Sequence, residues 1–396
     1  MSAATRGDEV IKCDSSGPHQ LSNRLEMEDI LGAPLQAMYI THMKHITSSC
    51  FSIVFGLWEA ANAAPGMTEL RLLEKFERKG EIQGLFPGVY AHRPGRQLAV
   101  VEKNFFRAAW SSDERLDDKT VVITGANTGI GKETAIDLAK RGAKVIMACR
   151  DMERAQAAMK EVMESSGSEN VVCMKLDLSD SKSIREFAEA INKGEPKLNI
   201  LINNAGVMVC PYGKTADGFE MQIGVNHFGH FLLTYLLIDL IKRSAPARIV
   251  TVSSMAHSWG TINLEDINSE KSYDKKGAYS QSKLANVLFT RSLAKRLEGT
   301  GVTTYSLHPG VVQTDLWRHL SGPQQFVMKA ISPFTKSSTQ GAQTSIYCAV
   351  EPSLEKESGG YYSDCAPASC SAAGKDDDLA QKLWELTCQQ LSITWE

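Results

Sequence analysis

The stretch Thr124-Gly125-Ala126-Asn127-Thr128-Gly129-Ile130-Gly131-Lys132 decides the fold of this 396-residue chain. It follows a short run of β-branched residues, Val121-Val122-Ile123, and leads at once into a segment with apolar residues at helical spacing. Glycines between a strand and a helix let the backbone approach a pyrophosphate, while the helix N-terminus supplies free N–H groups and a positive dipole. Three glycines alone are a weak signal, but their place between strand and helix makes them a strong one. The residues of this turn that we predict to contact a dinucleotide are Gly125, Asn127, Thr128, Gly129, Ile130 and Gly131.

From Lys119 onward, short β-branched runs alternate with helical segments, which is typical of a parallel sheet with helices on both faces. The segments between the runs are long enough for right-handed crossover helices. We therefore predict an α/β fold, a Rossmann-like doubly wound parallel sheet of six or seven strands. The predicted strands are residues 121–123, 145–148, 171–174, 200–202, 248–252 and 302–307, with a seventh near 360–362.

Residues 1 to about 97 lack sustained strand or helix periodicity and are broken by turns such as Ala64-Pro65-Gly66. We expect residues 1–110 to be an irregular, poorly ordered extension and residues 111–396 to form the cofactor-binding domain. The longest apolar stretch of the extension, residues 46–58, is well short of the ~20 residues that a membrane-spanning helix needs. The aromatic residues within 104–110 could contact a membrane interface, or they could pack against the domain.

Composition narrows the class of partner. The formal net charge is -3 and both signs are mixed throughout the chain, so we expect no nucleic-acid partner. The nine cysteines are scattered, odd in number and without a C-x-x-C pair, which indicates reduced thiols in a cytoplasmic protein; a Cys365–Cys370 disulfide is the lesser alternative. We predict no metal site, because His227, His230 and His257 lack the tight cluster with carboxylates or thiolates that zinc uses. We expect these histidines to be packing residues.

Residues at the ends of three predicted strands bear on the choice of cofactor. Arg150 stands where an NAD enzyme carries an acidic residue for the ribose hydroxyls, so it favours a 2′-phosphate and hence NADP(H). Asp151 leaves NAD(H) open, because it could serve the ribose or cap the next helix. Asp177 could face the adenine or cap the helix that starts near Ser181. At the end of the fourth strand, the residues that we predict to contact the cofactor are Asn203, Ala205 and Gly206.

Tyr279 and Lys283 are four residues apart in a segment of helical pattern, so their side chains lie on one face. A free tyrosine has a pKa of about 10, and a neighbouring cation would stabilise the phenolate and lower that pKa. The pair is therefore a candidate for general acid and base chemistry. By itself, this spacing is more often an accidental solvated pair.

Two further polar residues accompany this pair. Ser254 follows the fifth predicted strand, at the edge of the sheet where ligands bind, and can hydrogen-bond a reacting oxygen. The alternative of a turn-capping serine fits Ser253 better than Ser254. Asn226 lies within a long helical segment, where an amide is a poor helix former, so it has either a water-holding or helix-bending role or a packing role.

From about Asp117 to the C-terminus, the chain resembles the short-chain dehydrogenase/reductase family. The resemblance rests on T-G-x-x-x-G-x-G, N-N-A-G, the mid-helix asparagine, the serine, Y-x-x-x-K and a later P-G. The resemblance implies a catalytic tetrad in which Tyr279 exchanges a proton and Lys283 lowers its pKa and binds the nicotinamide ribose. In that tetrad Ser254 orients the substrate and Asn226 supports a water relay. The residues that it implies for contact with the nicotinamide are Pro309, Gly310 and Thr314.

More specifically, the segments 149–151, 218–220, 225–231 and 282–286 resemble the retinol dehydrogenase branch, which generally reduces retinal and lipid-derived aldehydes with NADPH. Relatives often start with a hydrophobic anchor, which residues 1–110 do not resemble. We expect a cytoplasmic protein, with a peripheral contact at the cytosolic face of the endoplasmic reticulum as a further hypothesis. The resemblance also implies a homodimer through helices such as residues 231–241; an intramolecular core is the equal alternative for that run.

Between Thr314 and about Gln340, apolar residues interrupted by Gly322-Pro323 resemble a mobile lid. Such a lid would favour an apolar aldehyde or ketone as the substrate. The alternative is a surface helix docked on the sheet. We predict hydride transfer between NADP(H) and the carbonyl or alcohol carbon of a small apolar substrate, such as retinal, retinol or lipid-derived aldehydes. One alternative is an NAD-linked steroid or hydroxyacyl dehydrogenase. Another alternative is a non-catalytic scaffold that senses NADP(H). The presence of all four tetrad side chains argues against this scaffold.

Overall fold

The computed structural model describes residues 110–313 and 335–395, which are built around one sheet with the strand order β3-β2-β1-β4-β5-β6-β7-β8. Neighbouring strands from β3 to β7 run parallel, and β8 pairs antiparallel with β7. The strands are β1 Thr120–Thr124, β2 Lys144–Cys149, β3 Val171–Lys175, β4 Ile200–Asn203, β5 Ala247–Val252, β6 Val302–His308, β7 Gly360–Ser363 and β8 Ala366–Ala368.

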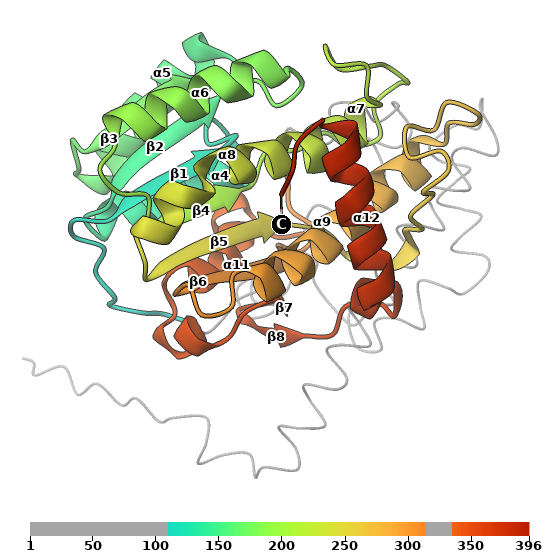
Figure 1. Ribbon diagram of the computed structural model, residues 1–396. Coiled ribbons are helices and arrows are strands. Elements are labelled where there is room, and N and C mark those ends of the chain that lie inside the picture. Colours follow the sequence, from blue (N-terminus) through green and yellow to red (C-terminus); the bar gives the residue numbers. More distant parts are fainter. Residues whose placement is uncertain (1–109, 314–334, 396) are drawn as a thin grey trace, which may run out of the picture.

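Helices cover both faces of the sheet (Figure 1). One layer contains α4, α5 and α11, and the other contains α6, α8 and α9, with α12 packed on α9. The α-helices are α4 Gly129–Lys140, α5 Met152–Ser166, α6 Ser181–Gly194, α7 Met221–Ile223, α8 Gly229–Arg243, α9 Lys275–Arg296, α11 Ser338–Val350 and α12 Asp377–Gln390. The short helices are the π-helical turn η2 Gly224–Phe228 and the 3-10 helices η3 Met255–Trp259, η6 Pro352–Lys356 and η7 Ala373–Lys375.

The apolar runs of the strands arise because both faces of the sheet are buried. Val121 and Ile123 pack in the layer that contains α4, while Val122, between them, packs in the opposite layer. A strand that is covered on both sides needs apolar residues at every position rather than at every second one. This pattern confirms the predicted doubly wound sheet.

The six predicted strands and the seventh near residue 360 are confirmed, but the prediction missed β8. This strand is exposed, has only three residues and contains Pro367, so it carries no apolar pattern. The β7–β8 turn is formed by Asp364 and Cys365, which both have a left-handed backbone (φ 52° and 55°). The predictions for residues 1–109 and for the apolar stretch 314–334 lie outside the described residues.

The strand order places a topological switch point between β1 and β4. From β1 the chain moves outward through β2 and β3, and then it returns to β4 on the other side of β1. At such a point, the turns at the carboxyl ends of the two central strands diverge and leave a crevice. The glycine-rich turn after β1 and the Asn204-Ala205-Gly206 turn after β4 therefore flank the same crevice.

The apolar residues of α8 belong to the core of the described domain. Phe231, Leu233 and Leu237 are buried against α6, α9 and the sheet. By length and composition, the segment Met221–Arg243 could cross a membrane, but 83% of its most apolar window is buried inside the protein, and the core helix of a soluble protein passes the same test. The intramolecular alternative therefore accounts for this run, and the homodimer stays a prediction.

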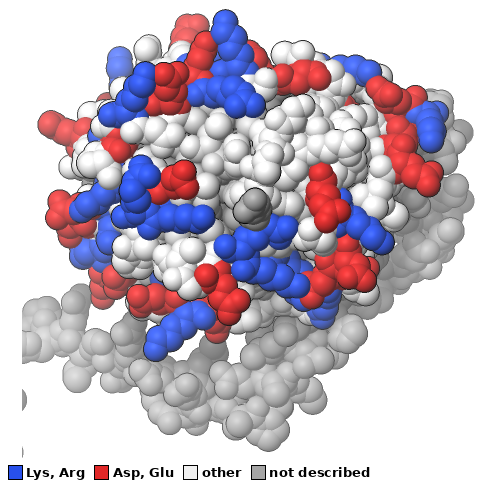
Figure 2. All heavy atoms as spheres, viewed as in Figure 1, with Lys and Arg blue, Asp and Glu red and all other residues white. Residues whose placement is uncertain are grey.

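The three histidines named above are buried and hydrogen-bonded. His227 Nε2 lies 3.0 Å from Thr387 Oγ1, and His257 Nδ1 lies 2.7 Å from the carbonyl oxygen of Ser254. Among the described residues, no group of three histidines, cysteines or acidic residues is placed to hold a metal, and the cysteines are free thiols. On the face shown in Figure 2, basic and acidic side chains are interspersed around an uncharged area in the upper middle of the view.

Candidate active site

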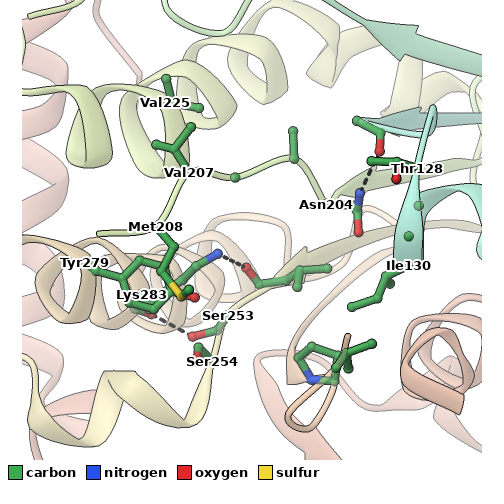
Figure 3. A pocket seen from close by; sticks show the side chains of 18 of the residues that line it. Thr128, Ile130, Asn204, Val207, Met208, Val225, Ser253, Ser254, Tyr279 and Lys283 are labelled. Carbon is green, nitrogen blue, oxygen red and sulfur yellow. Dashed lines mark hydrogen bonds between the residues drawn. The ribbon is translucent and has the colours of Figure 1, made fainter. Parts of the chain in front are cut away.

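A cavity of about 520 Å³ opens at the carboxyl edge of the sheet. It is lined by the turns that follow the first six strands and by the first turns of α9. In Figure 3, Thr128 and Asn204 lie on one side of this cavity, and Tyr279 and Ser254 lie on the other. The cavity therefore joins the predicted dinucleotide-binding turn to the predicted catalytic residues.

The glycine-rich turn has the geometry of an anion cradle. Gly125 and Gly129 have left-handed backbones, with φ values of 66° and 55°. A Cβ on Gly131 would lie 2.5 Å from the Gly125 carbonyl oxygen and 2.6 Å from Asn204 Nδ2, so no side chain fits there. Thr128 is the N-cap of α4 but makes no side-chain cap bond, which leaves N–H groups of the first turn available to an anion.

Asn204 fastens the turn after β4 to β1. Its Nδ2 donates to the carbonyl oxygen of Thr124 at 2.8 Å, and Thr124 Oγ1 accepts from the backbone N–H groups of Asn204 and Ala205 at 2.9 Å each. Ala205 and Gly206 line the cavity, but Asn203 does not. Asn203 is fully buried and donates to Thr234 Oγ1 in α8, so the prediction chose the wrong member of the asparagine pair.

Arg150 and Asp151 lie at the end of β2, and both line the cavity. Asp151 is the N-cap of α5, and its carboxylate accepts from the backbone N–H of Arg154 at 3.1 Å. The capping alternative for Asp151 is therefore confirmed. Arg154, which the sequence analysis did not single out, adds a second guanidinium to this end of the cavity.

Asp177 lines the cavity at the end of β3. Its carboxylate accepts from both the backbone N–H and the hydroxyl of Ser179, at 3.0 and 2.6 Å. The N-cap of α6 is Asp180, whose carboxylate accepts from the N–H of Lys182 at 3.0 Å. The suggestion that Asp177 caps this helix is therefore wrong, and a contact with the adenine stays a prediction.

Tyr279 and Lys283 lie one turn apart on α9, and both line the cavity although they are largely buried, with 8% and 4% exposed. Burial raises the pKa of Tyr279 to about 12, against a hydrogen bond with Ser254 that lowers it. The same bond is drawn in Figure 3. The hydroxyl therefore keeps its proton near neutral pH.

Lys283 Nζ donates to the carbonyl oxygen of Val252 at 3.1 Å and lies 5.8 Å from the centre of the Tyr279 ring. Burial lowers the pKa of this ammonium group to about 8. From the spacing of these two residues, we predict that the lysine lowers the pKa of the tyrosine. Burial gives Tyr279 a net upward shift of its pKa, and the lowering of that pKa by Lys283 stays a prediction.

Ser253 and Ser254 have the reverse of their expected structural roles. Ser254 is the N-cap of η3 and accepts from the N–H of Ala256 at 3.2 Å, while its hydroxyl also meets Tyr279. Ser253 Oγ donates to the carbonyl oxygen of Lys283 at 2.7 Å and so ties β5 to α9. The turn-capping role therefore belongs to Ser254, which faces the cavity at the same time.

Asn226 lies in the π-helical turn η2 between α7 and α8. Its Oδ1 accepts from the N–H of Val207 at 2.8 Å, and its Nδ2 donates to the Val207 carbonyl oxygen and to Ser282 Oγ at 2.9 Å each. Isolated π-helical turns occur frequently at functional sites. The structure thus brings Asn226 to the segment after β4, while the water relay stays a prediction.

Pro309 and Gly310 line the cavity after β6, and Thr314 lies outside the described residues. Gly310 has a left-handed φ of 96°, and a Cβ there would meet the side chain of Lys336 at 2.7 Å. Lys336 in turn forms an ion pair with Asp364 in the β7–β8 turn. The side chain of the buried Lys336 therefore packs close to Gly310 and leaves no room for a Cβ there.

Comparison with known proteins adds to this geometry. The model of the short chain dehydrogenase family matches residues 119–325. Human Retinol dehydrogenase 12 is 54% identical over 296 residues, which cover 75% of this chain and 93% of that protein. The chain belongs to the short-chain dehydrogenase family. Another member, mouse Retinol dehydrogenase 14, is 50% identical over 282 residues, covering 68% of this chain and 84% of that protein.

Solved structures agree with the fold. The crystal structure of an uncharacterised protein from Mycobacterium paratuberculosis is 38% identical, with a TM-score of 0.59, and the match covers 72% of this chain and 97% of that one. The Pseudomonas aeruginosa RhlG/NADP active-site complex is 24% identical, with a TM-score of 0.51 over 62% of this chain and 94% of that one, and it shows the shared fold. As a short-chain dehydrogenase, this chain is an oxidoreductase with a nicotinamide dinucleotide cofactor.

The residues present fit that cofactor. The glycine turn and the uncapped start of α4 suit a pyrophosphate, and Gly206 leaves the space beside Asn226 and Lys283 free of a side chain. A Cβ on Gly206 would lie 3.3 Å from Asn226 Oδ1 and 3.6 Å from Lys283 Nζ. The absence of a side chain at Gly206 therefore leaves room for a cofactor beside these two predicted site residues.

An apolar wall beside Tyr279 is the part of this dehydrogenase site that the sequence analysis missed. We use this name for residues 207–209, which follow the N-N-A-G turn and line the cavity together with Val225 and Trp259. Met208 lies on the same side as Tyr279 in Figure 3, and Trp259 is 47% exposed. The sequence signal that could have identified the wall is that residues 207–209 closely follow the fourth strand, because ligands bind at the carboxyl edge of the sheet. The wall fits a small apolar substrate.

Proposed function

We propose that this protein transfers hydride between NADP(H) and the carbonyl or alcohol carbon of retinal, retinol or lipid-derived aldehydes. The observation that carries the proposal is the position of the Tyr279 hydroxyl, which is hydrogen-bonded to Ser254 and shares one cavity with the glycine-rich turn and the apolar wall. The relatives named retinol dehydrogenases, at 48–54% identity, support a retinoid substrate.

In the direction of reduction, the residues of the site handle the carbonyl oxygen and its proton. NADPH supplies the hydride when it is bound. Ser254 holds the carbonyl oxygen, and Tyr279 gives that oxygen its proton as the carbonyl carbon takes the hydride, so an aldehyde becomes a primary alcohol. A phenol can protonate an alkoxide with little cost because an alkoxide is the stronger base. Oxidation of the alcohol reverses these steps.

Lys283 and Asn226 act around this proton transfer. An ammonium group at Lys283 stabilises the phenolate that Tyr279 becomes, and so limits the rise of the tyrosine pKa on burial. Asn226 holds Val207, and with it the wall, against η2. The binding of the nicotinamide ribose by Lys283 and the water relay through Asn226 are further parts of the proposal.

The preference for NADP(H) rests on charge at the adenosine end. Arg150 and Arg154 both line the cavity there and can pair with a 2′-phosphate. Asp151, the residue that could favour NAD(H), is engaged as the cap of α5. Two guanidinium groups, together with a carboxylate that is engaged as a helix cap, therefore support the preference for NADP(H).

The test is oxidation of NADPH by the purified full-length protein with all-trans-retinal, decanal and a steroid ketone, each repeated with NADH. We expect turnover of retinal or decanal with NADPH preferred. Turnover of the steroid alone with NADH would favour the steroid dehydrogenase alternative. NADPH binding without turnover of any of them would favour the scaffold.

The variant Tyr279→Phe separates binding from chemistry. It keeps the ring and removes the proton donor, so turnover should fall at least about 100-fold while the Kd for NADPH stays within about twofold. Unchanged turnover would contradict the proposed mechanism. We also propose a homodimer and a contact with the cytosolic face of the endoplasmic reticulum. Sedimentation would test the homodimer, and membrane flotation would test the membrane contact.

A further inference from the structure

The apolar wall has a strained backbone at Val209. This residue lines the cavity with a left-handed φ of 53°, which is unfavourable for a β-branched side chain. Such a conformation persists where the surroundings hold the backbone in it, and it clusters at active sites. The groups that hold Val209 therefore shape the cavity beside Tyr279.

Gln222 makes the contact that holds Val209. Its Oε1 accepts from the backbone N–H of Val209 at 2.7 Å. Its Nε2 donates to Tyr273 Oη and to the carbonyl oxygen of Lys275, at 2.9 Å each. These three bonds leave the amide one orientation, since a flipped amide would put a donor against the Val209 N–H and an acceptor against the Lys275 carbonyl.

This contact belongs to a set that fixes the whole wall. Asn226, one helical turn beyond Gln222, holds both backbone groups of Val207. At the other end, Tyr273 Oη donates to the carbonyl oxygen of Cys210 at 2.9 Å. Side chains from two other segments thus bind four of the eight backbone N–H and C=O groups of residues 207–210. Gln222 is fully buried, so water does not compete for these bonds.

Gln222 also connects the wall to the helix that carries the proton donor. Lys275, whose carbonyl oxygen it binds, is the first residue of α9, and Tyr279 follows four residues later. One side chain therefore sets the spacing between the wall and the start of the catalytic helix. The gap between these two elements is where an apolar chain attached to the reacting carbonyl would lie.

We propose that Gln222 is a positioning residue that determines substrate specificity by holding the apolar wall at a fixed distance from α9. This inference rests on the proposed function, because it assumes that the substrate carbonyl meets Tyr279. Long apolar substrates use the wall, whereas a short aldehyde reaches Tyr279 without contacting it. Loss of the amide should therefore penalise long substrates selectively.

The test compares kcat/KM for decanal and for propanal in the full-length protein, with NADPH as cofactor. Gln222→Met keeps the length of the side chain and removes its three hydrogen bonds. We expect the ratio of the decanal to the propanal kcat/KM to fall at least about fivefold, with the Kd for NADPH unchanged within about twofold. A ratio within about twofold of the wild-type value would overturn the proposal.

The matched control is Gln281→Met. Gln281 is also a buried glutamine that bonds two backbone groups, the Asn263 N–H at 2.8 Å and the Ile267 carbonyl oxygen at 3.1 Å. Unlike Val209, neither Asn263 nor Ile267 lines the cavity. An equal fall of the ratio in this control would mean general loosening and would also overturn the proposal. If Gln222→Met does not fold, Tyr273→Phe removes one partner of Gln222 and the tether of Cys210, and should lower the same ratio.

The outcome is separable from that of the proposed function. A wild-type enzyme that reduces decanal but not retinal would refute the retinoid substrate, and the ratio test would still decide the role of Gln222. Conversely, efficient retinal reduction by the wild type with an unchanged ratio in Gln222→Met would keep the proposed function and reject this inference.

Discussion

Lys283→Met should stabilise the folded protein while it removes turnover. The pKa of Lys283 is lowered by burial from its usual 10.5 to about 8, so the folded state holds this proton less tightly than the unfolded chain. At about 1.4 kcal/mol for each pKa unit, the penalty near neutral pH is about 3 kcal/mol. The lost hydrogen bond to Val252 offsets about 1 kcal/mol, and Asn286 Nδ2 still donates to that carbonyl oxygen at 3.2 Å. The expected gain is about 2 kcal/mol at pH 7.

Urea unfolding of the ligand-free protein at pH 7 and at pH 10.5 measures this gain. The penalty is nearly complete below about pH 8 and is mostly lost as the pH rises to 10.5, where Lys283 is neutral in the folded state and about half protonated in the unfolded chain. The advantage of Lys283→Met should therefore shrink at high pH. Lys160→Met on the exposed side of α5 is the control and should show no such change. A variant that is less stable than the wild type at pH 7, or a difference independent of pH, would refute the reasoning.

Three further substitutions, two of them paired with a comparison variant, test other parts of the site. Ser254→Ala should lower kcat about 100-fold or more, since one donor to the reacting oxygen is lost. Ser253→Ala should instead lower the free energy of unfolding in urea by about 1 kcal/mol and leave most of the turnover. Equal losses of kcat in the two variants would contradict these assignments. Gly131→Ala should weaken NADPH binding at least about tenfold in a fluorescence titration, because the new Cβ would lie 2.5 Å from a backbone oxygen, while Gly194→Ala, which meets nothing within 4 Å, should leave it unchanged. Arg150→Asp should shift the ratio of kcat/KM values towards NADH, and an unshifted ratio would remove Arg150 from contact with a 2′-phosphate.

Local sequence patterns predicted the elements that carry the site. The glycine-rich turn after β1 and the four-residue spacing of Tyr279 and Lys283 depend on neighbours in the chain, so both were visible before the fold. The strands were visible for a related reason: burial on both faces leaves an uninterrupted apolar run. In contrast, β8 is short and exposed and depends on pairing with β7, so it left no such run.

Adjacent polar residues were harder to assign. The Asn203 side chain bonds to α8, whereas that of Asn204 bonds back to β1. At the end of β5, the Ser253 side chain bonds to α9, whereas that of Ser254 caps η3. Successive side chains of a strand point to opposite faces, but where the strand ends this alternation gives way to the path of the following turn. That path is set by contacts with other elements.

The sequence by itself determined the fold class and the family and placed Tyr279 and Lys283 on one helix face, because these depend on periodicity and on short motifs whose spacing is local. Only the tertiary structure decided the pKa directions of Tyr279 and Lys283, since desolvation depends on what packs around them. It also decided the role of Gln222, whose partners lie 13 and more than 50 positions away along the chain. No local pattern marks such a residue, because its hydrogen bonds exist only once α7, the wall and α9 have come together.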